Sequence, residues 1–169
     1  MQRDPTAVVG RRIIAAIVDG LLHFAANAII FFLLAKRVTG VGQGAAVFGR
    51  LTVNDRGWEV TGGRSGLYYL LSFGLLFLHY GWLQGTRGYT LGKHAARVRV
   101  IGPDGHVPGI GRSVLRTIIW IVDAAPWCIP GLVGFILVLS TQGHRRIGDM
   151  AADTYVVTEE YVHAPQPQS

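Results

Sequence analysis

The stretch "IIAAIVDGLLHFAANAIIFFLLA" (residues 13–35) decides the class of this protein, because it runs for 23 residues with one formal charge. A bilayer core of about 30 Å needs about 20 apolar residues in a helix. A second stretch, "LYYLLSFGLLFLHYGWLQ" (67–84), supplies 18 residues without a formal charge. Hydrophobic residues make up 50% of the 169-residue chain and charged residues 15%. These features predict an integral membrane protein.

A third apolar region, 114–140, contains Asp123, Pro126 and Pro130. Proline interrupts a helix, and each half is short for a crossing. If the region turns back, the side with the N-terminus carries 11 Lys and Arg residues against 5. A single crossing would leave 9 against 7. Cytoplasmic loops carry a basic excess, so we predict a hairpin or re-entrant element whose irregular backbone is shielded by protein or water.

The predicted fold is therefore an all-α membrane protein with two transmembrane helices, a Pro-broken third region and a few short strands. In the cytoplasmic loop, "RVRVI" (97–101) alternates as a strand does, and so does "DTYVV" (153–157) near the C-terminus. Short strands seldom stay ordered alone, so we expect these two to pair, which requires both to lie on one side of the membrane. A hairpin is expected in "LTVNDRGWEVT" (51–61).

We treat residues 1–169 as a single domain. Its expected parts are spans near 13–35, 67–84 and 114–140, an external loop at 36–66, a cytoplasmic loop at 85–113 and a disordered tail at 158–169.

One face of the first span is polar. Arg12 and Asp19 are seven residues apart, nearly two full helical turns, so both project from the same face. His23 and Asn27 continue that face at steps of four residues. A charge at mid-membrane depth costs about 2.5–3.5 kcal/mol and normally faces the protein interior or water. The face predicts either an ion or proton path, which His79 of the second span could join, or interhelical hydrogen bonding.

The same spacing recurs in "RTIIWIVDAA" (116–125), where Arg116 precedes Asp123 by seven residues. Two such segments could pair crosswise, Arg12 with Asp123 and Arg116 with Asp19, which would lower the cost of burying each acid. A third polar cluster, "GHRRIGDMAAD" (143–153), follows the last apolar region.

Within that third cluster, Arg146 and Asp149 lie three residues apart and could form a pair on a helix surface.

These motifs together resemble the RDD family of small prokaryotic membrane proteins. The resemblance rests on Arg12 with Asp19, on "TLGKHAARVRVIGPDG" (90–105) and on "RIGDMAADTYVV" (146–157). The family is named for one arginine and two aspartates; Arg12 and Asp19 match the first two, and Asp149 is the second aspartate, with Asp123 as the competitor. Asp153 departs from the family pattern, which has glycine there.

The resemblance implies a protein of the prokaryotic plasma membrane, and transport of unidentified ligands or sodium/proton exchange has been suggested for the family. We therefore expect transport of a cation or small ligand, with Asp19 and Asp123 binding the ion and His23 or His79 relaying protons. The alternative is a non-catalytic scaffold or accessory subunit that binds partner helices.

Further expectations concern partners and chemistry. We expect contact with the lipid bilayer, a homo-oligomer or a membrane partner protein, and cytoplasmic N- and C-termini. The basic residues flank apolar spans, so we expect no nucleic acid. No nucleophile and base are paired at an aqueous surface, and Cys128 is the single cysteine, so we expect no enzyme, no cofactor and no metal.

Overall fold

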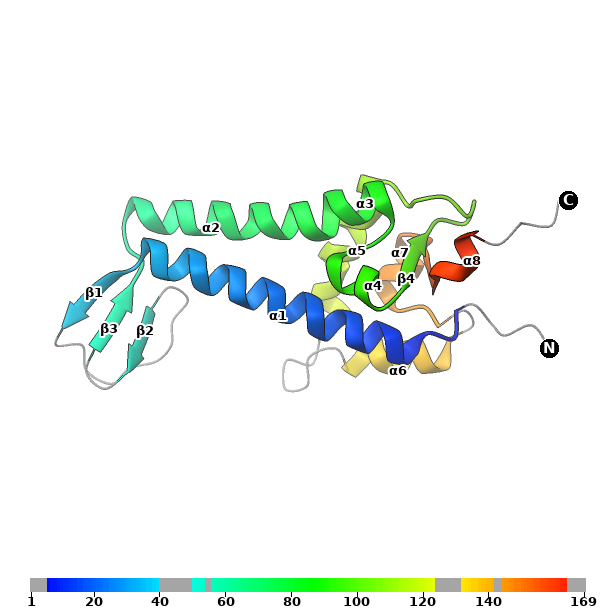
Figure 1. The fold of residues 1–169 in the computed structure, drawn as a ribbon, viewed down its shortest axis with the longest axis horizontal. Helices are drawn as coiled ribbons and strands as arrows, with labels where there is room; N and C mark the ends of the chain where they lie inside the picture. Colours follow the sequence, from blue (N-terminus) through cyan, green and yellow to red (C-terminus); the bar gives the residue numbers. More distant parts are fainter. Residues whose placement is uncertain (1–5, 40–49, 54–55, 124–131, 142–143, 164–169) are drawn as a thin grey trace, which may run out of the picture. The chain divides into compact units, whose positions relative to one another are not determined.

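The computed structural model describes residues 6–39, 50–53, 56–123, 132–141 and 144–163. The chain is mostly helical with short strands, and it forms two compact units (Figure 1). The first unit comprises Met1–Gly20 and Phe77–Ser169, and the second comprises Leu21–Leu76. Helix α1 (Val9–Leu34) contributes its first turns to one unit and the rest to the other.

Two helices are long and apolar enough to cross a membrane, which confirms the two long apolar helices that the sequence predicts. One is α1, and the other is a continuous helix over Gly63–Arg87. Only 6% of the residues in the most apolar window of each helix are buried, whereas a core helix of a soluble protein would be mostly buried. Gly88, with φ 75°, ends the second helix in the left-handed conformation that glycine adopts at helix ends.

The second long helix changes its winding along its length. It starts as α2 (Gly63–Leu76), continues as the π-helical segment η1 (Phe77–Leu83) and ends as α3 (Gln84–Arg87). A π-helix closes its hydrogen bonds over five residues, so side chains beyond this point project in directions that a regular helix would not give.

Two glycines bring α5 (Ile110–Asp123) close to this helix. A Cβ on Gly85 would lie 2.6 Å from the Ile110 Cα, and one on Gly81 would lie 3.1 Å from a Val114 methyl group. Small residues four apart commonly line such close helix contacts in membrane proteins. The packing holds the start of α5 against η1 and α3.

The third apolar region contains two helices among the described residues, α5 and α6 (Leu132–Ser140). At 14 and 9 residues they are about 21 and 14 Å long, less than the bilayer core. Pro126 and Pro130 lie outside the described residues. The turn at these prolines therefore stays a prediction.

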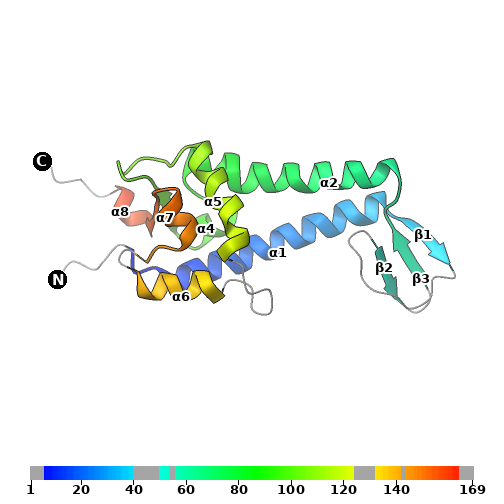
Figure 2. The same cartoon turned by 180° about the vertical axis from the view of Figure 1, so that it is seen from behind.

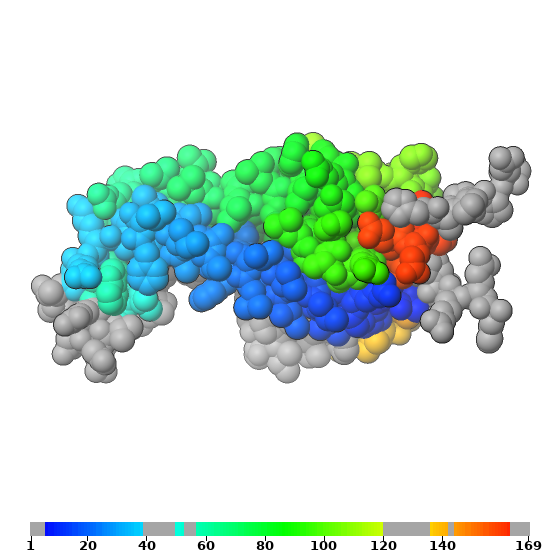
Figure 3. Space-filling model, viewed as in Figure 1, coloured from blue at the N-terminus to red at the C-terminus, as the bar shows by residue number. Residues whose placement is uncertain are grey.

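The predicted pairing of the two short strands is confirmed. Strand β4 (Val98–Ile101) pairs with β5 (Tyr155–Thr158) in antiparallel register, with Val100 opposite Val156. Val8, Val98, Val100 and Val156 form a small apolar core on this sheet. Segments from the start, middle and end of the chain therefore lie on one continuous surface of the first unit (Figure 3).

The end of the chain corrects one expectation. Helix α8 (Glu159–His163) follows β5, within the tail that we expected to be disordered. The Glu159 N–H donates to the Arg97 carbonyl at 3.0 Å, which ties the start of α8 to the strand pair. Residues 164–169 lie outside the described residues.

The second unit places a small sheet in the expected external loop. The predicted hairpin is confirmed: β2 (Arg50–Val53) pairs with β3 (Arg56–Glu59). Strand β1 (Lys36–Thr39), which the sequence did not predict, pairs with the other edge of β3. Phe32 of α1 lies edge-on to Trp58 of β3, with ring centroids 6.2 Å apart, so the sheet packs directly on the end of the helix.

Candidate functional site

Asp19 lies in the first unit and is almost fully enclosed, with 2% of its surface exposed. Its Oδ1 is 2.8 Å from His79 Nε2 and accepts from the Gly92 N–H at 2.7 Å. Its Oδ2 accepts from the Thr90 hydroxyl at 2.5 Å. The carboxylate thus joins α1 to η1 and to the segment that follows the second long helix.

The sequence Thr-Leu-Gly-Lys (90–93) makes this enclosure possible. Thr90 is the N-cap of α4 (Leu91–Ala95), and its hydroxyl accepts from the Lys93 N–H at 3.3 Å while it donates to Asp19. A hydroxyl can do both at once. Gly92 permits the close approach, because a Cβ there would lie 2.2 Å from the Ala15 carbonyl oxygen. The first turn of α4 therefore lies directly against α1.

Asp149, on α7 (Ile147–Ala151), is enclosed by three arginines and is 0% exposed. Arg12 pairs with its Oδ2, Arg116 Nη2 lies 2.6 Å from its Oδ1, and Arg146 Nε lies 3.3 Å from the same oxygen. Burial alone would raise the pKa of Asp149, but the guanidinium groups of Arg116 and Arg12 outweigh it and hold the pKa well below its usual range. Asp149 therefore stays ionised at neutral pH.

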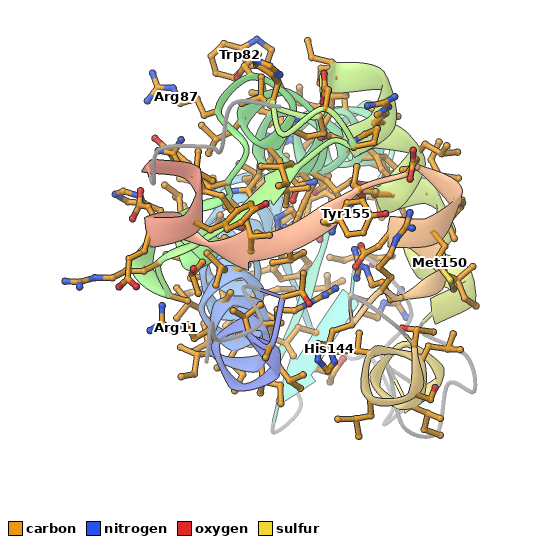
Figure 4. All side chains as sticks on the ribbon, turned by 90° about the vertical axis from the view of Figure 1, so that its right-hand side faces the viewer. Arg11, Trp82, Arg87, His144, Met150 and Tyr155 are labelled. Atoms are coloured by element: carbon orange, nitrogen blue, oxygen red, sulfur yellow. The ribbon has the colours of Figure 1, made fainter. Side chains whose placement is uncertain are left out.

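The arginines around Asp149 also bind neighbouring segments. Arg116 is 1% exposed and donates to the Thr154 hydroxyl at 3.2 Å, and Arg12 donates to the His144 carbonyl at 2.5 Å. Arg11, the neighbour of Arg12, is exposed and points outward at the rim (Figure 4). Helices α5 and α7 pack side by side here (Figure 2). The cluster thus fastens the start of α1, α5 and the segment after α6 to one another.

The structure corrects the crosswise pairing. Arg12 and Arg116 both bind Asp149, whereas Asp19 is bound by a histidine, a hydroxyl and a backbone N–H. The proposed pairing of Arg116 with Asp19 is therefore wrong. Asp123 ends α5, and its side chain lies outside the described residues, so its pairing with Arg12 stays a prediction, while Arg12 pairs with Asp149.

The other predicted residues are placed as follows. His79 joins Asp19, and Arg146 pairs with Asp149 as the i,i+3 spacing suggests, although that acid is buried and not on a helix surface. His23 and Asn27 lie in the second unit, where Asn27 donates to the His23 carbonyl at 2.9 Å. That bond lies within α1 and joins it to no other element.

Asp153 has a backbone conformation that most residues avoid. Its φ of 46° is in the left-handed region, which glycine adopts freely and most other residues avoid. The Asp153 carboxylate accepts from Arg145 at 3.0 Å, and the same guanidinium lies over the Tyr155 ring at 4.4 Å (Tyr155 is labelled in Figure 4). The turn therefore keeps the conformation that a glycine would have, and the acid gains an ion pair.

The sequence did not predict Thr90 and Gly92 as partners of Asp19, although a threonine at the start of Thr-Leu-Gly-Lys is typical of a helix cap. A capping signal indicates where a helix starts but not which remote acid the first turn will bind. Within the described ranges, no three His, Cys, Asp or Glu side chains converge to hold a metal ion. Chemically, the arrangement offers one carboxylate bound by an imidazole, a hydroxyl and a backbone N–H, and a second carboxylate bound by guanidinium groups.

Comparison with known proteins identifies a family. The model of the RDD family matches residues 6–153, most of the chain and both buried aspartates. No curated protein and no solved structure matches the chain.

Proposed function

The chain belongs to the RDD family of membrane proteins, and from this premise we propose that it transports a cation or small ligand in exchange for protons, with the Asp19–His79 pair carrying the proton. The contact between these two side chains, at 2.8 Å, is the observation that carries the proposal. Each residue comes from one of the two helices able to cross a membrane. A proton bound by this pair is therefore held by both candidate spans.

The partners of Asp19 support this role. A carboxylate bound to arginine stays ionised, because arginine does not lose its proton in proteins. Asp19 is instead bound by an imidazole, a side chain that can both donate and accept a proton. The pair can therefore gain and lose one proton without breaking an ion pair to arginine.

We assign Asp149 a different role, that of a structural anchor. Three arginines surround it, and it stays ionised throughout the physiological range. The two buried aspartates thus have different roles in this proposal. Asp149 holds the helices together, and Asp19 takes part in proton exchange.

We expect Asp19→Asn to abolish proton exchange, because asparagine cannot pass a proton to His79. The measurement is proton flux in proteoliposomes that carry a pH gradient, with a pH-sensitive dye inside and sodium or potassium salts outside. Asparagine keeps the size of the side chain and can still accept a hydrogen bond from Thr90.

The matched control is Asp104→Asn, since the Asp104 side chain is 62% exposed in a turn of the first unit. Its flux should equal that of the wild type. Unchanged flux in Asp19→Asn, with the protein folded, would rule out the assigned pair.

The second candidate is a membrane scaffold or accessory subunit. The exposed apolar side chains on the two long helices favour it, among them Phe24 (74%), Leu33 (77%), Leu70 (69%) and Phe73 (68%). Lipid or partner helices must cover these side chains in a membrane. Purification of one stoichiometric partner, together with absence of flux from the wild-type chain, would favour this candidate over transport.

We further propose that the third apolar region turns back and that both termini lie on the cytoplasmic side. The pairing of β4 with β5 supports this arrangement, because β4 precedes the region and β5 follows it. The contact of Arg12 with Asp149 supports it as well. Strands on opposite sides of a bilayer could not pair.

Labelling of engineered cysteines tests the topology. In a Cys128→Ser background, cysteines replacing His106 and Glu160, both exposed, should react from the cytoplasmic side. A cysteine replacing the exposed Thr61 should react only from the opposite side. If His106 and Glu160 react from different sides, the third region crosses once and the proposed topology is wrong.

A further inference from the structure

Lys93 is the basic residue of the site whose surroundings differ most from those of the arginines. It is half-buried, and its amine donates to the Gln84 side-chain carbonyl at 2.5 Å. Gln84 is 2% exposed. The amine also lies over the Tyr80 ring, 5.9 Å from the centroid. Its immediate partners are therefore an uncharged amide and an aromatic face.

No ion pair joins the Lys93 amine to a carboxylate within the part of the chain that the structure describes. The two carboxylates that act on it, Asp19 and Asp149, are taken up by other donors. Two guanidinium groups, Arg116 and Arg146, repel it. A partly buried ammonium with an amide partner and cationic neighbours is costly, and such a group loses its proton instead.

Lysine can relieve this cost and arginine cannot, because a buried lysine readily becomes neutral. Burial first, and then the Arg116 guanidinium, lower the pKa of Lys93 to about 7, against the attraction of Asp19. The local structure thus makes Lys93 a group that is charged in part of the protein population at neutral pH.

Lys93 is also coupled to the proton-carrying pair. The backbone N–H of Lys93 donates to the Thr90 hydroxyl and that hydroxyl donates to Asp19, so the turn that carries Lys93 is held against the pair. The Asp19 charge attracts the ammonium. A proton taken up by the Asp19–His79 pair removes that attraction and favours release from Lys93, and the coupling is reciprocal.

We propose that Lys93 is the group at which the chain takes up and releases its exchanged proton on the side of the membrane where α4 lies. The inference rests on the proposed transport function and deepens it. On release, one N–H bond of the ammonium breaks, the electron pair stays on nitrogen and the proton passes to water. On uptake the reverse occurs, so protons and charge balance in each cycle.

The chain contains two lysines, Lys36 and Lys93, which allows a direct titration. Reductive methylation with ¹³C-formaldehyde labels both lysine amines and the α-amine of the chain, Lys36→Arg leaves the Lys93 signal as the one lysine signal, and its loss in Lys93→Arg assigns it. We expect this signal to titrate near pH 7 in lipid nanodiscs, and Asp19→Asn to lower its midpoint. The exposed Lys36 of the wild type is the internal control. A Lys93 signal that titrates together with Lys36 would overturn the proposal.

Two variants connect this titration to transport. Lys93→Arg keeps the charge but cannot release the proton, and we expect loss of proton flux. Gln84→Glu keeps the shape of the acceptor and adds a carboxylate beside the amine. Because the new charge favours the ammonium, the midpoint of Lys93 and the pH at which flux rises should both increase together.

The outcomes separate the two proposals. Wild-type flux in Lys93→Arg, or a Gln84→Glu variant whose titration shifts while its flux profile does not, would exclude Lys93 from the exchange. The transport proposal would survive either result. Absence of flux from the wild type would instead refute transport, and the role of Lys93 with it, even if the amine titrates near pH 7.

Discussion

Replacing Asp149 with asparagine is expected to destabilise the protein by about 3–5 kcal/mol, because removing one partner of a buried ion pair leaves the others uncompensated. Asp149 is fully buried and pairs with Arg12, Arg116 and Arg146. Without the carboxylate, these three cations would repel one another at the junction of α1, α5 and α7. Thermal or denaturant unfolding of the purified protein in detergent measures the loss.

The pH dependence of unfolding provides a second measure. The pKa of Asp149 is depressed in the folded protein, so its contribution is fully present above the ordinary carboxyl pKa of about 4 and is lost as the pH falls through the lower folded value. The wild type should lose stability in that acid range, and the asparagine variant should lose less.

The control for Asp149 is again Asp104→Asn, whose exposed side chain should change stability by no more than about 0.5 kcal/mol. If the Asp149 and Asp104 variants unfold at the same temperature as the wild type, the cluster of arginines contributes no stability and the structural role is wrong.

The second large effect is expected for Gly92→Ala. An alanine Cβ would lie 2.2 Å from the Ala15 carbonyl oxygen and 2.8 Å from the Asp19 carboxyl carbon. Both are fixed by α1, so α4 must move away, and the Gly92 hydrogen bond to Asp19 is lost with it. Overpacking usually costs about 1–3 kcal/mol, and a clash with backbone belongs at the upper end of that range.

Gly20→Ala is the matched control, because a Cβ at Gly20 meets no atom within 4 Å. Gly20 lies within α1, where alanine favours the helix by about 0.5–1 kcal/mol. Equal unfolding temperatures for the two alanine variants would show that α4 does not need its close approach to α1.

Some parts of this fold can be predicted from the sequence because their causes are local or depend on composition. The two long apolar runs identify the long helices, since length and polarity alone decide whether a segment can cross a bilayer. The alternating runs at 97–101 and 153–157 identify strands β4 and β5, and the turn-forming sequence Asn-Asp-Arg-Gly identifies the hairpin of β2 and β3. The spacing of Arg12 and Asp19 places both on one helix face.

The partners of the charged residues could not be predicted in the same way. The repeated spacing in "RRIIAAIVDG" (11–20) and "RTIIWIVDAA" (116–125) suggests that the two segments neutralise each other. Instead Asp149, from a third segment, accepts from both Arg12 and Arg116. From the sequence, any buried carboxylate could pair with an arginine. The packing of α5 against α7 decides which carboxylate lies within hydrogen-bonding distance.

By itself, the sequence determined that this is a membrane protein with two long apolar helices, a polar face on the first and a strand pair joining the middle of the chain to its end. Those features follow from hydrophobicity and periodicity, which act over short stretches. Only the tertiary structure decided that Asp149 pairs with three arginines. It also decided that Asp19 is bound by His79, Thr90 and Gly92, and that the Lys93 amine donates to Gln84. The physical reason is that a buried charge takes its partner from whichever segment the packing brings within hydrogen-bonding distance.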